Sequence, residues 1–460
     1  MQTKFDSAQL ADPATAAAAG AIRSCVHCGI CTATCPTYVL LGNELDSPRG
    51  RIYLVKEMLE NSARPSAQVV KHLDRCLSCL ACETHCPSGV SYRRIIDRGR
   101  AYVEEHYRRP LHDRVLRELL ASILPHRGRF RVALTLAALA RPLAGWFERT
   151  ASLRSLALLL RLSQAAQAMR GTAPQPRVHP AQRRAYPAQT RVHPPHPAGE
   201  PAAALRRASA HTLRVGLARG CVEPVLDPSI QAASVRLLQR AGCEIVRAAR
   251  EGCCGALSHH MGREEEALRL ARANVDAWHR QVEAQPLAAI VVTAAGCGPV
   301  VRDYGHLLRD DPQYAAKAAR VSALACDLSE LLDRIGLPPI TRLPPTIVGY
   351  HPACSLQHGQ RVATAPARLL TDAGFEVRLP QDAHLCCGSA GVYNILQPDI
   401  AAQLGARKAE ALDALRADVI ATGNIGCMVQ IGAASGAPVA HLAELLDWAT
   451  GGPKPAGMRS

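Results

Sequence analysis

The chain has 460 residues, of which 48% are hydrophobic, 4% aromatic and 20% charged, and its net charge is +15. This length is sufficient for two or three domains with substantial cores, and the composition excludes a disordered chain. Nearly all of the excess positive charge lies between residues 101 and 215, which carry 19 basic and six acidic side chains. No nucleic-acid-binding motif accompanies this segment. We therefore expect it to contact an acidic partner or an anionic membrane face, and we expect no nucleic-acid partner.

Cysteine is unusually frequent, with 18 residues in a long chain. Disulfide-rich secreted proteins are usually short, and the first residues contain no apolar signal segment. No stretch reaches the roughly 18 uninterrupted apolar residues of a membrane-spanning helix. We therefore expect free thiols in a cytoplasmic protein, either soluble or bound peripherally to the inner face of the cytoplasmic membrane.

Two cysteine motifs lie within the first 100 residues. Each has the spacing C-x2-C-x2-C-x3-C-P, which is typical of bacterial ferredoxins that bind [4Fe–4S] clusters. Thiolates at every third residue can reach three irons of one cluster, and the fourth cysteine begins the next helical stretch and is directed towards the other cluster. Two structural zinc sites are the alternative, but zinc needs two ligand pairs per site rather than four close cysteines. We assign Cys25, Cys28, Cys31 and Cys86 to cluster 1, and Cys35, Cys76, Cys79 and Cys82 to cluster 2.

The two motifs begin 51 residues apart, and the interval contains an amphipathic stretch. We expect residues 1–100 to form a helical ferredoxin module, similar to those of respiratory iron–sulfur subunits. His27 and His85 lie inside the motifs but are not expected to be ligands, because cysteines fill every position. Arg49 and Arg51 are expected to form ion pairs with nearby carboxylates or to face a partner.

Two segments of different composition follow this module. Residues 101–170 contain largely apolar runs among arginines, which predicts a helical, basic connector. Residues 171–205 are rich in proline, histidine, alanine and arginine, which predicts an extended linker.

The remainder of the chain contains an internal repeat. One set of four cysteines recurs with an offset of 133 residues for the first cysteine and for the adjacent pair, and of 130 residues for the last; in each set the adjacent pair precedes a glycine. The two sets are Cys221, Cys253, Cys254 and Cys297, and Cys354, Cys386, Cys387 and Cys427. The predicted strands are 213–217, 244–246 and 289–293 in the first half and 347–350, 376–379 and 419–422 in the second, with helices at 229–241 and 360–373. We expect two tandem α/β lobes, 206–340 and 341–455, whose cysteines gather beyond the strand ends.

The repeated cysteines resemble the cysteine-rich CCG domain of heterodisulfide reductase subunits and of iron–sulfur subunits of flavin-dependent 2-hydroxyacid dehydrogenases. The fullest pattern of that domain ends in C-x-x-C, whereas Val300 and Gln430 occupy the last position here. The eight lobe cysteines are therefore candidates for a further cluster, and the alternative is a cleft lined by reduced thiols. Cys243 and Cys326 fall outside the repeat and are expected to be small core residues.

Across nearly its whole length the chain resembles the glycolate oxidase iron–sulfur subunit family, known as the F subunit. The resemblance implies an oxidoreductase complex in which flavoprotein subunits oxidise glycolate to glyoxylate and this chain carries the electrons to an acceptor such as membrane quinone. No dinucleotide-binding or Walker motif is found, so no flavin is expected on this chain and it is not expected to oxidise substrate alone. Two alternatives stay open: a heterodisulfide-reductase-like thiol–disulfide enzyme, and the equivalent subunit of a lactate or glycerol-3-phosphate dehydrogenase.

Overall fold

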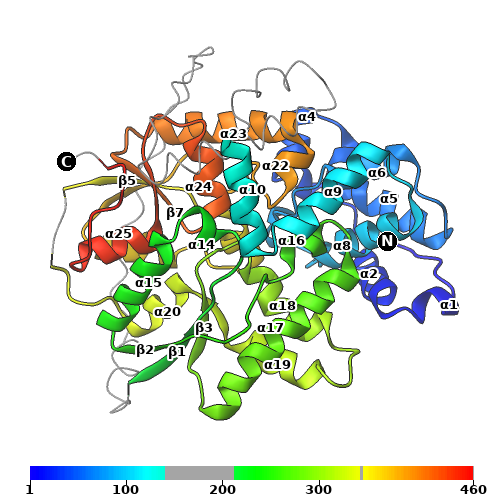
Figure 1. Ribbon diagram of the computed structural model, residues 1–460. Coiled ribbons are helices and arrows are strands. Elements are labelled where there is room, and N and C mark those ends of the chain that lie inside the picture. Colours follow the sequence, from blue (N-terminus) through cyan, green and yellow to red (C-terminus); the bar gives the residue numbers. More distant parts are fainter. Residues whose placement is uncertain (140–211, 342–344, 459–460) are drawn as a thin grey trace.

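The computed structural model describes residues 1–139, 212–341 and 345–458. It contains a helical N-terminal module and two α/β lobes, and Figure 1 shows the module in blue on one side and the lobes in green to red on the other. This arrangement confirms the expected fold class. In the described part of the chain, no helix combines the length and the apolar character needed to cross a membrane. The predicted linker 171–205, and the connector beyond residue 139, lie outside the described residues.

The N-terminal module is built from helices around one apolar core. The core contains Ile22, Val55, Leu73 and Ile95, each no more than 1% exposed, and five of the cysteines belong to it or pack against it. The helices of the module, all with short connections, are α1 (Ser7–Leu10), α2 (Pro13–Arg23), α3 (Ile30–Ala33), α4 (Pro36–Leu41), η1 (Glu44–Asp46), α5 (Pro48–Glu60), α6 (Ala67–Asp74), α7 (Ala81–Thr84) and α8 (Tyr92–His106).

Helices α9 (Leu111–Ile123) and α10 (Arg127–Leu139) connect the module to the lobes. Phe130 of α10 packs in one apolar cluster with Val225 of the first lobe and Ile425 of the second. Figure 1 shows α10 lying across the junction between the lobes. The chain leaving the module is therefore held against both lobes.

Each lobe has a four-stranded parallel sheet with the same topology. The first sheet has the order β2-β1-β3-β4 and the second the order β6-β5-β7-β8. Parallel strands require crossover helices, which explains the strand–helix alternation of the sequence. The strands are β1 (Leu213–Leu217), β2 (Cys243–Val246), β3 (Ala289–Val292) and β4 (Ala325–Asp327), then β5 (Ile347–Tyr350), β6 (Glu376–Arg378), β7 (Val419–Thr422) and β8 (Val439–His441).

Helices cover both faces of these sheets. The first lobe has α14 (Glu223–Leu226), α15 (Ser229–Arg240), α16 (Ala256–His260), α17 (Glu264–Ala284), α18 (Gly298–Leu307), α19 (Ala315–Leu324) and α20 (Leu328–Ile335). The second has η4 (Ser355–Gly359), α21 (Ala365–Asp372), α22 (Tyr393–Leu396), α23 (Pro398–Asp413), α24 (Ile425–Gly432) and α25 (Leu442–Ala449). The helix predicted at 360–373 thus begins later, at Ala365, because residues 360–364 form an irregular connection after the π-helical turn η4. The six predicted strands are present, whereas β4 and β8 were not predicted.

The two lobes share one core and face each other at their strand ends. One apolar cluster includes Leu217 and Leu237 of the first lobe together with Tyr350 and Trp448 of the second. At the carboxyl ends of β3 and β7, the Ala295 amide donates a hydrogen bond to the Gly423 carbonyl (3.0 Å). The lobes are therefore one packed unit. Cys243 and Cys326 lie in the shared core, as expected.

Candidate metal centres

The first set of cysteines, those assigned to cluster 1, lines a single cavity in the N-terminal module. Cys25 is buried, Cys31 and Cys86 are half-buried, and Cys28 is exposed at the surface. Cys82 of the second motif also lines this cavity. The structure thus brings together four thiols from two motifs that are far apart in sequence, with one of them open to a partner.

The second set, those assigned to cluster 2, lies deeper in the same module. Cys35 and Cys76 are buried beside a Tyr92 hydroxyl that donates to Cys76 Sγ (3.6 Å). Burial raises the pKa of Cys79 and of Cys82 well above the usual value, and nearby cysteines add to it: Cys354 of the second lobe first for Cys79, and Cys79 first for Cys82. Such thiols are neutral without metal and lose their protons when a metal binds.

The two motifs adopt the same backbone turns. The second residue after the first cysteine has positive φ in both, at His27 (61°) and Ser78 (50°). The residue after the second cysteine does too, at Gly29 (86°) and Leu80 (62°). Left-handed residues at matching places curl both loops in the same way. Cys35 then caps α4, as expected, whereas no helix begins at Cys86, where Pro87 enters a turn instead.

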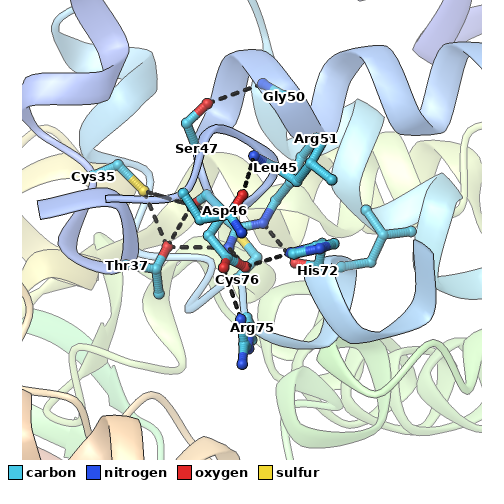
Figure 2. A network of polar contacts seen from close by, with 12 residues as sticks. Cys35, Thr37, Leu45, Asp46, Ser47, Gly50, Arg51, His72, Arg75 and Cys76 are labelled. Carbon is cyan, nitrogen blue, oxygen red and sulfur yellow. Dashed lines mark hydrogen bonds and ion pairs between the residues drawn. The ribbon is translucent and has the colours of Figure 1, made fainter. Parts of the chain in front are cut away.

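A buried ionic network holds the second set in place (Figure 2). Asp46 is fully buried and accepts from His72 Nδ1 and Arg75 Nη1, both at 2.8 Å. Arg51, 1% exposed, donates to the His72 carbonyl (2.7 Å) and to Cys35 Sγ (3.8 Å). Burial lowers the pKa of Arg51, but the charges of Cys76, Tyr92, Cys35 and Asp46 raise it overall, so the guanidinium stays charged. The predicted pairing of the motif arginines with carboxylates is confirmed at Arg51 and Asp46 (3.6 Å).

The third set is formed by the repeated cysteines of the first lobe. Cys221 Sγ lies 3.4 Å from Cys253 Sγ, and Cys254 contacts both Cys253 and Cys297. All lie beyond the carboxyl ends of strands, as expected. Gly255, with φ of 88°, allows the turn that follows the adjacent pair; a Cβ there would lie 3.0 Å from the Ala267 carbonyl oxygen.

The fourth set is formed by the equivalent cysteines of the second lobe. Cys354 and Cys386 have sulfurs 3.5 Å apart, and those of Cys387 and Cys427 are 3.4 Å apart. Cys79 of the N-terminal module packs in one apolar cluster with Cys354 and Cys386. The second set is therefore in contact with the fourth.

The donor chemistry of these sites fits iron–sulfur clusters. Each contains four thiols and the first two are enclosed by a helical scaffold, which suits [4Fe–4S] clusters. A nearby buried imidazole, His351, was not recognised from sequence, because a lone histidine before a cysteine is not distinctive. Buried Lys408, which lies beside the fourth set, was missed for the same reason.

Comparisons with known proteins agree with this architecture. Residues 21–90 match the family described as 4Fe-4S dicluster domain, and residues 215–302 and 348–432 match the cysteine-rich domain CCG. The glycolate oxidase iron–sulfur subunit of Escherichia coli is 39% identical over 98% of this chain and 99% of its own length. This chain belongs to the family of glycolate oxidase iron–sulfur subunits. A probable member of the family from Bacillus subtilis is 31% identical over 94% of this chain and 95% of its own length.

A second group of relatives is more distant. Lactate utilization protein A of an Exiguobacterium species is 28% identical over 49% of this chain, which covers 94% of that protein. Family membership therefore rests on the full-length relatives. The match to iron–sulfur families also supports the predicted clusters as the cofactors of this chain.

Proposed function

We propose that this chain is the electron-transfer subunit of an acceptor-dependent glycolate dehydrogenase, in which a partner flavoprotein oxidises glycolate to glyoxylate. The observation that carries the proposal is the continuity of the cysteine sets. Cys82 borders the cavity of the first set, and Cys79 of the second set adjoins the apolar cluster that contains Cys386 and lies within electrostatic range of Cys354. The sites therefore form an uninterrupted series from the surface at Cys28 into the second lobe.

The ligand assignment is part of this proposal. The first set would hold one [4Fe–4S] cluster and the second set another, and bound clusters accept and release single electrons. The protein's own contribution is to exclude water from the second set and to hold its thiolates beside the charged Arg51. Such charges and hydrogen bonds tune the potential of a cluster.

The surface around Cys28 suits a flavoprotein partner. Val26 and Ile30 flank this cysteine and are 67% and 51% exposed. Exposed apolar side chains beside a redox ligand favour a protein contact that brings the two cofactors together and excludes water. We infer that electrons enter at this face.

The acceptor is proposed to be membrane quinone, with peripheral contact through α9 and α10. Exposed apolar side chains recur along α9 at Leu111, Val115 and Leu119, and exposed arginines, including Arg108 and Arg114, flank them. An apolar stripe with basic neighbours favours an anionic membrane surface.

Lactate is the second candidate substrate of the partner, because the lactate utilization proteins align over half of this chain. The partner's substrate distinguishes the two, since this chain need not contact it. Co-purified complex would be mixed anaerobically with glycolate or with lactate in a stopped-flow instrument, and reduction of the clusters followed by absorbance. We expect rapid bleaching with glycolate. Bleaching only with lactate would mean that the partner oxidises lactate rather than glycolate. No bleaching with either substrate, despite full iron content, would refute the proposed function.

A further inference from the structure

His351 occupies a special position in the second lobe. It follows β5, and its amide donates to the Ala421 carbonyl (2.8 Å). In the first lobe the amide of Ala218 donates to the Val291 carbonyl (2.9 Å), and both residues lie three positions before the first cysteine of their set. His351 and Ala218 are therefore structural equivalents. The imidazole distinguishes the second lobe from the first.

The His351 imidazole is fully buried, and neither ring nitrogen has a hydrogen-bond partner among the described residues. Buried polar atoms without a partner are rare and energetically unfavourable. One ligand atom each from His351, Cys387 and Cys427 lies within 4.8 Å of the others. Donors that bind one ion at about 2.0–2.3 Å are close enough to one another to satisfy this geometry. The unpartnered imidazole therefore points to a metal.

A second difference between the lobes indicates negative charge at the fourth set. Lys408 is 3% exposed and donates to the Asp382 carbonyl (2.8 Å), and within the described ranges no carboxylate pairs with it. It lies within electrostatic range of Cys386 and Cys387. The Asp382 carboxylate also acts on this ammonium but is paired with Arg407, and the two cysteines act on it more strongly. A buried ammonium is stabilised by a nearby anion, and thiolates bound to metal would supply one.

The first lobe has a neutral side chain at the equivalent place. The glycine after each cysteine pair approaches the carbonyl of Ala267 in the first lobe and of Ala401 in the second, which aligns α17 with α23. Asn274 then corresponds to Lys408, and its amide donates to the Cys253 carbonyl (2.6 Å). Both the imidazole and the buried cation are thus confined to the second lobe.

We propose that His351 ligates iron: it is a fifth protein ligand of an iron–sulfur cluster in the second lobe, beside Cys354, Cys386, Cys387 and Cys427. Five donors exceed the four that a single tetrahedral zinc ion takes. The imidazole is neutral where a thiolate would be anionic, and histidine ligation raises the potential of a cluster. A cluster with this histidine ligand would thus be more oxidising than the same cluster with a thiolate in that place. The inference rests on the proposed loading of the chain with iron–sulfur clusters.

The test is pulsed EPR on the full chain, purified anaerobically after growth with ¹⁵N-histidine. Spectra would be recorded across a potentiometric titration so that each paramagnetic state is sampled. We expect one signal with strong coupling to histidine nitrogen. In His351→Cys that coupling should disappear, while iron is retained and the midpoint potential of the same signal falls.

The matched control is His441→Asn. His441 is also buried and ends strand β8 of the same lobe, but both ring nitrogens have partners, the Thr293 carbonyl and the Ala443 amide. This variant should keep the nitrogen coupling. If the wild-type chain shows both N-terminal clusters but no histidine coupling, or if the coupling survives in His351→Cys, the proposal is overturned and the proposed function stands. Stoichiometric zinc that His351→Ala releases would also overturn it.

Discussion

Arg51 and Cys35 meet in the interior of the N-terminal module, with 3.8 Å between guanidinium Nη1 and the sulfur. The arginine is 1% exposed and also contacts Thr37 Oγ1 (3.0 Å). A buried cation next to a proposed cluster ligand stabilises the thiolate charge. It also joins η1 to α6, so the same side chain supports the fold and the electrostatics of the second set.

Replacing Arg51 with Met should therefore lower the midpoint potential of one N-terminal cluster and destabilise the module by about 3 kcal/mol, as expected for one partner lost from a buried ionic network. Potentiometric EPR and denaturant unfolding measure the two effects. Arg49→Met is the matched control, because Arg49 pairs with Glu44 at the surface (2.6 Å) and should cost less than about 1 kcal/mol. Equal potentials in the two variants would contradict the assigned role.

The glycine after each cysteine pair gives a second prediction. Gly388 has φ of 88°, and a Cβ there would lie 2.8 Å from the Ala401 carbonyl oxygen. Gly388→Ala should lower the free energy of unfolding by about 1–2 kcal/mol, because alanine is unfavourable in the left-handed conformation. Displacement of α23 by the new methyl group should add to this loss. Gly242→Ala is the control, because Gly242 has φ of 85° but nothing within 4 Å of its Cβ position. Thermal unfolding should show a larger loss for the first variant, and equal losses would exclude a packing role.

Features that depend on residues close together in the sequence could be predicted, whereas features that depend on distant residues were missed. The N-terminal cysteine sets could be predicted from spacings of a few residues, and the lobe sets from the recurrence of one cysteine pattern. Strands β4 (Ala325–Asp327) and β8 (Val439–His441) have only three residues each, too few for a periodic pattern, and they lie beyond the last cysteine of each set. The equally short β6 was found because it precedes the cysteine pair of the repeat. The burial of Arg51 depends on His72, 21 residues away, and that of His351 on Cys387. Such partners come together only in the tertiary structure.

The contact between the module and the first lobe should depend on pH. His259 Nε2 lies 3.1 Å from Asp97 Oδ2, across α16 and α8. Burial lowers the pKa of His259, but the Asp97 charge, with Asp303 nearby, raises it overall above 6.5. Burial raises the pKa of Asp97, but His259 lowers it to about 2.

The stabilisation from His259 is therefore complete below about pH 6.5 and is lost as pH rises through its raised pKa. That from Asp97 is present above about pH 4 and is lost as pH falls towards 2. The stability difference between wild type and His259→Gln should shrink from pH 6 to pH 9, as measured by denaturant unfolding. A difference that is constant across this range would mean that the imidazole is not protonated.

Removing one ligand of the first set tests the cluster assignment. Cys31→Ser should reduce the iron content by about four per chain and lower turnover of the complex, because the first set loses one of its four thiols. Burial, and then neighbouring thiolates, raise the pKa of Cys31 to about 11, so this thiol binds metal only by releasing a strongly held proton. Cys243→Ala is the control, since Cys243 lies in the shared core and should keep all iron. Full iron in Cys31→Ser would refute the assignment.

Ligands in the fourth set can be tested in the same way. Cys387→Ser removes a thiol whose sulfur lies 3.4 Å from that of Cys427. If the second lobe holds a cluster, the wild-type chain should contain more than about eight irons and the variant should return to about eight. Iron and acid-labile sulfide analysis decides this. Unchanged iron, spectra and activity would favour a cleft of reduced thiols.

The exposed apolar face at Cys28 gives the last prediction. Ile30 is 51% exposed beside this cysteine, so Ile30→Asp should leave folding and iron content intact but place an uncompensated charge in the proposed flavoprotein contact. We expect at least about tenfold weaker binding of the flavoprotein, corresponding to about 1.4 kcal/mol, in interferometry with the loaded chain. Leu136→Asp on α10 is the control, since Leu136 is 60% exposed and belongs to a connector helix rather than to the cysteine loop of Cys28. Because the α9 and α10 face is proposed to contact a membrane, this control should instead weaken binding to anionic vesicles. If Leu136→Asp releases the flavoprotein while Ile30→Asp does not, the flavoprotein does not bind at the Cys28 face, and the proposed entry of electrons at that face is wrong.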